Sequence, residues 1–266
     1  MDLNTSEKNS EELKKEHAFQ LLVAAGEIQL QSGAEITRVE ETMKHMAKSL
    51  EIESLETYII ANGIFTTAEG IHHMQRAGLK HIATGDTDLR KIEAVNSLSR
   101  ELEDGSCSIE EAWTRIGEIR KMGDYPPHIL IPAYSIGAGS FCYALGGSGN
   151  DAFVAAIVGL LLGVFFHILS RWNISKAIRT ILGSMLVSIM TIKIYEMGLG
   201  DATNRIMVGG LIPMIPGVPF TNAIRDFVEN DYVSGLIRLM DVLLILVSIV
   251  VGVGITWGFP GFSLYR

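Results

Sequence analysis

One uncharged stretch in the second half of the chain carries the residues best suited to hold a small polar solute. Its conformationally special residues are Gly209, Gly210, Pro213, Pro216, Gly217 and Pro219. Each proline lacks an N–H group and clashes with the carbonyl four residues earlier, so the carbonyls of Gly209, Ile212 and Ile215 are expected to lose their helical partners. Inside a bilayer, unpaired backbone is tolerated only beside protein or a water-filled cavity. The pattern predicts a broken transmembrane helix that forms a solute site, and a proline kink needed only for packing is the alternative.

The residues after this break sharpen the prediction. Thr221 or Asn222 is expected to cap a new helix that runs to Asp231. Its first N–H groups would face the break and attract a carboxylate. Freed carbonyls on one side and N–H groups on the other suit a zwitterion. Arg225 and Asp226 follow the break closely, and Arg225 lies either at the mouth of the pathway or among lipid phosphates.

Lys193 is the charged candidate inside a predicted span. It lies about two turns from the end of that span, so its long stem can snorkel to the interface. The alternative is a functional cation that faces a substrate carboxylate or pairs with Glu196 at i+3.

Other chemistry is poorly represented in the sequence. Four side chains, Glu69, His72, His73 and His81, form the only metal-like grouping, and adjacent histidines near a strand end point to opposite faces. They are expected to be solvated, without a metal. The chain has no G-x-S-x-G motif and no Walker sequence, so we expect neither an enzyme nor an ATP-driven pump, and no cofactor. Transport would then depend on an ion or substrate gradient.

The charge distribution divides the chain of 266 residues. Residues 1–128 hold 14 Lys and Arg against 23 Asp and Glu, whereas residues 129–266 hold 8 and 7. An acidic front half excludes nucleic-acid binding, because phosphate contacts need clustered cations. Residues 1–128 are therefore predicted to form a cytoplasmic α/β domain, and residues 129–266 a membrane domain.

The second half contains stretches long enough to cross a bilayer, which needs about 20 apolar helical residues. The five predicted transmembrane helices are residues 129–147, 152–170, 180–199, 206–220 and 239–259, the fourth being broken by prolines. The first two, joined by a glycine-rich turn, must form a tight antiparallel pair. Basic residues near the span ends place the N-terminal domain in the cytoplasm, and a re-entrant fourth span would reverse the C-terminus. The predicted location is the plasma membrane.

Periodicity predicts the elements of the front half. These are helices at about 11–31 and 34–50, a hairpin of strands 58–61 and 64–67 around Asn62-Gly63, a third strand at 79–84, and a helix at 86–104. A last helix starts with the capping box Ser108 to Glu111 and ends before Pro126. Glu35 and its charged neighbours on the second helix form either a solvated face or an interaction surface.

Three stretches together resemble a known family. They are Ser32-Gly33-Ala34-Glu35-Ile36-Thr37-Arg38-Val39-Glu40-Glu41-Thr42-Met43, then Gly146-Gly147-Ser148 before Asp151, and Pro216-Gly217-Val218-Pro219-Phe220-Thr221-Asn222-Ala223-Ile224-Arg225-Asp226 continuing through Asp231 and Ser234-Gly235 to Arg238-Leu239. The chain resembles the N-terminal, YjjP-like half of the threonine/serine exporter family. Asn230 stands where glycine is common in that family.

The resemblance implies half of a secondary transporter that exports a small metabolite. It implies a separately encoded, YjjB-like membrane subunit as partner, and a threonine- or serine-type amino acid or a dicarboxylate such as succinate as substrate. An odd number of spans fits this reading, since a partner of opposite topology would complete an inverted repeat. A regulatory or scaffold subunit, a membrane-tethered enzyme and a homo-oligomer stay open as alternatives.

Overall fold

The computed structural model describes residues 3–52, 54–69, 75–82, 85–172 and 174–258. The chain forms two compact units. The first unit consists of Met1–Gly123 and Val218–Leu239, and the second of Asp124–Gly217 and Met240–Arg266. The sequence predicted a division at residue 128 with everything after it in the membrane domain. The structure places Val218–Leu239 in the first unit instead, because polar side chains of this segment bond to the front helices, as described below.

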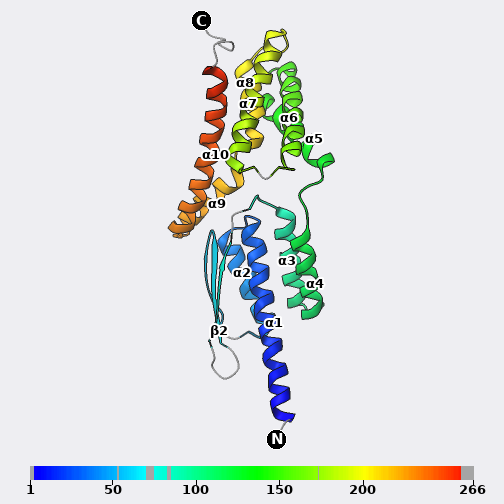
Figure 1. Ribbon diagram of the computed structural model, residues 1–266, viewed down its shortest axis with the longest axis vertical. Coiled ribbons are helices and arrows are strands. Elements are labelled where there is room, and N and C mark those ends of the chain that lie inside the picture. The colour runs from blue at the N-terminus through cyan, green and yellow to red at the C-terminus, as the bar shows by residue number, and fades with distance from the viewer. Residues whose placement is uncertain (1–2, 53, 70–74, 83–84, 173, 259–266) are drawn as a thin grey trace. The chain divides into compact units, whose positions relative to one another are not determined.

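The helices of the first unit are α1 (Leu3–Gln31), α2 (Ile36–Ser49), α3 (Leu89–Glu103) and α4 (Ile109–Lys121) (Figure 1). Their apolar faces meet in one core, which includes the fully buried Leu21, Met43, Leu98 and Ile116. α3 starts later than the predicted residue 86, because the carboxylate of Asp88 caps it by accepting the Arg90 N–H at 3.1 Å.

A three-stranded antiparallel sheet completes the front half of this unit. Its strands are β1 (Glu56–Ile60), β2 (Gly63–Glu69) and β3 (Gln75–His81), with β2 in the centre. The hairpin is present as predicted, but Ile60 pairs with Gly63, so the turn is Ala61-Asn62 and Gly63 opens β2. The third strand lies earlier than the predicted 79–84, since it pairs with β2 along that strand's full length. His72 and His73 lie outside the described residues.

The helices of the second unit are α5 (Pro127–Ala144), α6 (Gly149–Leu169), α7 (Lys176–Glu196) and α8 (Thr203–Leu211), followed by the short 3₁₀ helix η2 (Ile212–Met214) and joined by the later part of α10 (Tyr232–Gly258). α5 and α6 form the predicted antiparallel pair. A Cβ on Gly139 would lie 3.1 Å from Ala156, and one on Gly163 would lie 3.1 Å from Ile131, so successive contacts run in opposite directions. Glycine lets the two backbones approach closely.

Three of the described helices, α6, α7 and α10, are long and apolar enough to cross a membrane. α8 with η2 meets that test only together with α9 (Gly217–Val228), so one broken span would raise the number to four. α5 is not among them, and it carries Pro127, His128 and Pro132 within its 18 residues. The predicted number of five spans is therefore not confirmed.

As predicted, the proline-rich segment is not a regular helix. η2 ends at Met214, Ile215 is extended, and α9 begins at Gly217. Two of the three carbonyls that were expected to be free are occupied, because Ile212 accepts the Ile215 N–H at 2.9 Å and Ile215 accepts the Gly217 N–H at 2.8 Å. The break is thus a pair of tight turns in which the carbonyls of Ile212 and Ile215 are occupied.

The predicted capping role of Thr221 and Asn222 is wrong. Both residues lie in the second turn of α9, which begins four residues before Thr221. The physical reason is Pro219, which lies in the first turn, where a missing N–H leaves no helical hydrogen bond unmade. The helix can therefore start before this proline.

Asn230 makes the turn from α9 into α10. Its φ of 68° lies in the left-handed region, where glycine is favoured and asparagine is the next most tolerant residue. The Asp231 N–H reaches back to the Asp226 carbonyl at 2.8 Å and closes the end of α9. α10 then begins at Tyr232, seven residues before the predicted span 239–259.

Candidate functional site

The residues predicted to form a site fall into two groups in the two units. Gly209, Gly210, Pro213, Pro216, Gly217 and Lys193 belong to the second unit, and Thr221, Asn222, Arg225 and Asp226 belong to the first. Each group is described separately.

Gly209 and Gly210 are positions of close helix packing. A Cβ on Gly209 would lie 2.7 Å from the Cys142 Cβ and 2.8 Å from the Ala138 carbonyl oxygen of α5. A Cβ on Gly210 would lie 2.9 Å from a methyl of Val187 on α7. The two glycines therefore allow α8 to pack tightly between α5 and α7, as small residues do between membrane helices.

The break itself is less crowded than α8. Pro213 and Pro216 are half-buried, and Gly217 is exposed. A Cβ added to Gly217 would meet no described atom within 4 Å. Gly217 therefore is not required for packing in this conformation, unlike Gly209.

In the first unit, α9 and the start of α10 bind the turn between α1 and α2. That turn passes through Gly33, whose φ of 77° favours glycine. The Asn222 side-chain amide donates to the Gly33 carbonyl at 3.0 Å, and the Arg238 guanidinium donates to the Ala34 carbonyl at 2.8 Å. We call this set of contacts the α1–α2 latch: Gly33, Ala34, Glu35, Asn222, Arg225, Asp226 and Arg238.

Charges complete the α1–α2 latch. Arg225 forms an ion pair with Glu35, with the arginine side chain 45% exposed. Asp226 and Arg238 form a second ion pair at 3.1 Å, in which both side chains are buried. The first stretch and the third stretch of the family resemblance thus meet in space, although about 190 residues separate them along the chain.

Thr221 and Lys193 lie at exposed positions, outside the α1–α2 latch and the packed helix contacts. Thr221 is exposed on α9. Lys193 lies near the end of α7 and forms an ion pair with Glu196 at 2.7 Å, with its side chain 53% exposed. Of the alternatives raised by the sequence, the structure shows the pairing at i+3.

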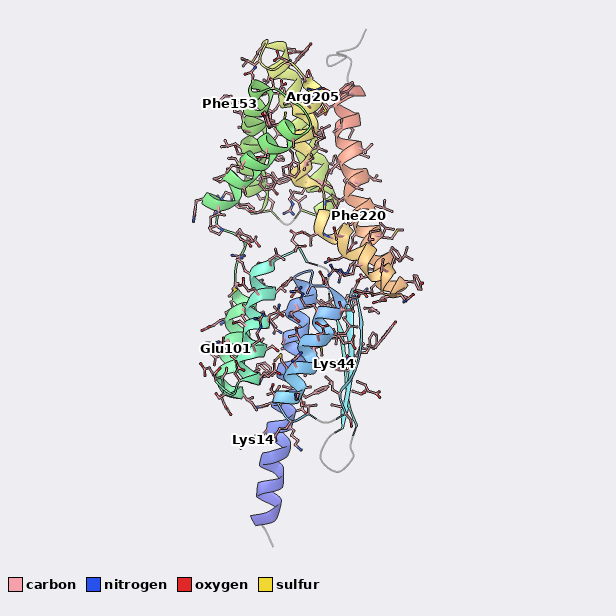
Figure 2. The ribbon with its side chains drawn as sticks, turned by 180° about the vertical axis from the view of Figure 1, so that it is seen from behind. Lys14, Lys44, Glu101, Phe153, Arg205 and Phe220 are labelled. Carbon is pink, nitrogen blue, oxygen red and sulfur yellow. The ribbon has the colours of Figure 1, made fainter. Side chains whose placement is uncertain are left out.

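Asp151 is a polar residue whose importance the sequence did not reveal. Its side chain is buried and accepts the N–H groups of Ser148 at 2.9 Å, Asp201 at 2.7 Å and Ala202 at 3.1 Å. It therefore caps α6 and also fixes the loop that enters α8. The spacing of Ser148 and Asp151 signals the cap, but no local signal identifies the second loop. Arg205, labelled in Figure 2, adds a contact by donating to the Gly146 carbonyl.

Comparison with known proteins identifies a family and several relatives. The ThrE family, described as "Putative threonine/serine exporter", matches residues 20–259. A "Probable threonine/serine exporter" of Mycobacterium tuberculosis is 21% identical over 91% of this chain and 46% of its own length. A "Probable succinate transporter subunit YjjP" of Klebsiella aerogenes is 21% identical over 88% of this chain and 92% of its own.

A fungal relative extends the comparison. "Pheromone-regulated membrane protein 10" of Yarrowia lipolytica is 26% identical over 85% of this chain, and the match covers 19% of the fungal protein. The chain thus spans less than half the length of the mycobacterial and fungal relatives, and nearly all of the Klebsiella one. No solved structure matches the chain.

The apolar helices and the family match together define a helical membrane protein. The chain belongs to the ThrE family.

Proposed function

We propose that this chain is one half of a secondary transporter that exports a small metabolite across the plasma membrane together with a partner membrane subunit. The substrate is a threonine- or serine-type amino acid, or a dicarboxylate such as succinate. The names of the mycobacterial and Klebsiella relatives support these two classes. The word subunit in the latter name supports a partner, which we take to be YjjB-like.

The observation that carries the proposal is the interruption between η2 and α9. Ile215 is extended between two helical segments within an otherwise apolar run. Interruptions of this kind occur in membrane proteins where a solute or a moving joint needs them. The carbonyls of Ile212 and Ile215 are already hydrogen-bonded. This favours a break that acts as a flexible joint, rather than one that binds the solute through free carbonyls.

In the proposal, the α1–α2 latch also connects the front domain to this joint. α9 follows the break directly along the chain, and its polar face bonds to the front helices through Asn222 and Arg225. A change in the front domain would therefore reach the break through α9. In our proposal the front domain lies in the cytoplasm and adjusts the pathway, without catalytic activity of its own.

The test is efflux from cells that produce this chain together with the membrane protein encoded beside it. Cells preloaded with labelled threonine, serine or succinate should release at least one of them faster than cells with an empty vector. Equal release of all three would overturn the proposal. Release that survives Pro216→Ala and Asn222→Ala unchanged would favour a regulatory subunit.

Lys193 provides a prediction about substrate class. Lys193→Gln should lower succinate efflux about tenfold and spare threonine efflux, because a dicarboxylate carries a second anionic group that needs a cation. Initial efflux rates of the two labelled substrates measure the difference. Glu196→Gln is the matched control, since it breaks the same ion pair and keeps the cation. Equal loss of both substrates in Lys193→Gln would contradict a role in substrate choice.

A further inference from the structure

Most hydroxyl side chains buried in the membrane helices are bonded to their own backbone. Thr180 and Ser184 of α7 donate to the carbonyls of Lys176 and Ile181 at 2.9 Å and 3.0 Å. On α10, Ser248 donates to the Leu244 carbonyl at 2.7 Å, and Thr256 behaves in the same way at 3.1 Å. This back-bonding is the ordinary way in which a helical serine or threonine is satisfied.

Two hydroxyls on α7 depart from this pattern. Ser188 is 0% exposed and Thr191 is 1% exposed, yet neither hydroxyl has a hydrogen-bond partner among the described residues. They lie three residues apart, on one face of the same helix. A buried hydroxyl without a partner costs about 1–3 kcal/mol, so two of them side by side in an apolar helix need an explanation.

Their surroundings connect them to the packed part of α8. Val187, the residue before Ser188, is the side chain that faces Gly210 of α8. Val187 also belongs to the buried apolar cluster of this unit, against which Met190 and Ile194 pack. Ser184, one turn before Ser188, lies against Gly252 of α10, and Thr191 follows Val187 by one turn. The two hydroxyls therefore lie on the face of α7 that packs against α8 and α10.

We propose that Ser188 and Thr191 contact the transported solute when α7 and its neighbours part, and that they are satisfied by it. A hydroxyl offers one donor and two acceptor positions, so the pair suits a small metabolite that carries a carboxylate together with hydrogen-bond donors. The inference rests on the proposed exporter function and assigns residues to its pathway.

The test uses two nearly isosteric substitutions, Ser188→Ala and Thr191→Val, in cells that also produce the partner subunit. Each should lower efflux of labelled threonine, serine or succinate about tenfold, the effect of losing a hydrogen bond to a charged group. Thermal unfolding should show unchanged or raised stability, because the substitutions remove an unsatisfied group. Ser184→Ala is the matched control, since Ser184 lies on the same helix and is already bonded.

A cysteine experiment gives a readout besides activity. In a chain whose Cys107 and Cys142 are replaced by alanine, Ser188→Cys and Thr191→Cys should react with a small thiol reagent, and the transported solute should slow that reaction. Ser184→Cys should show no such protection. Wild-type efflux with unchanged rates in both isosteric variants would overturn the inference alone, whereas absence of wild-type efflux would overturn the proposed function.

Discussion

Replacing Arg238 by methionine is expected to destabilise the first unit by about 3–5 kcal/mol, the cost of leaving one member of a buried ion pair without its partner. Arg238 is 7% exposed and Asp226 is 2% exposed, so water cannot take the place of the guanidinium. The substitution also removes the donor that binds the Ala34 carbonyl. Both losses fall on the α1–α2 latch.

The measurement is thermal unfolding of the full chain in detergent, with hydrogen exchange of residues 32–35 as a local readout. The double variant Asp226→Leu with Arg238→Met should recover most of the loss, because an apolar pair of similar volume is often as stable as a buried ion pair. Arg225→Gln, which breaks the exposed ion pair with Glu35, should cost less than about 1 kcal/mol. A single variant as stable as the double would contradict the structural role assigned to Arg238.

The position of this ion pair explains why sequence alone does not connect residues 218–239 with the front helices. Periodicity and hydropathy report on neighbours along the chain, and both describe the segment as the flank of a membrane span. Its decisive contacts are distant, since the Arg238 bond to Ala34 joins residues 204 apart. A hydropathy window cannot distinguish an arginine at a lipid surface from one that bonds to another helix.

Local conformation was more predictable, because the physical constraint is carried by the residue itself. Pro213 and Pro216 each remove an N–H group and crowd the preceding turn, and the structure contains the break at these residues. Asn230 at a glycine-like position has a positive φ, as that substitution implies. What the prolines do not determine is where the next helix starts, and α9 starts at Gly217 because Pro219 fits its first turn.

The role of Asp151 is partly local and partly dependent on distant contacts. Its cap of α6 follows from the four residues Ser148 to Asp151, and this part of its role is local. Its bonds to the N–H groups of Asp201 and Ala202 depend on how α6 and α8 pack, which in turn depends on the glycines of α8. A carboxylate that satisfies several N–H groups inside an apolar unit therefore becomes recognisable only once the packing is known.

The same packing makes Gly209→Ala the substitution with the largest expected effect on transport. A methyl group at this position would lie 2.7 Å from the Cys142 Cβ and 2.8 Å from the Ala138 carbonyl oxygen, so α8 must move away from α5. Overpacking of this kind costs about 1–3 kcal/mol and displaces backbone. Because α8 leads directly into the broken segment, we expect efflux to fall to the level of the empty vector.

Alanine substitutions at two other glycines distinguish a loss of helix packing from a loss of movement at the break. Gly254→Ala lies on α10 with no described atom within 4 Å of the added carbon, so it should keep both stability and efflux. In Gly217→Ala the added carbon also meets no described atom within 4 Å, but the residue lies at the break, so the variant should keep its stability and lower efflux, because a joint that bends through left-handed backbone needs glycine. Efflux rates and melting temperatures of the three variants, measured together, test this. Normal efflux in Gly209→Ala would show that the close contact of α5 with α8 is not needed for transport.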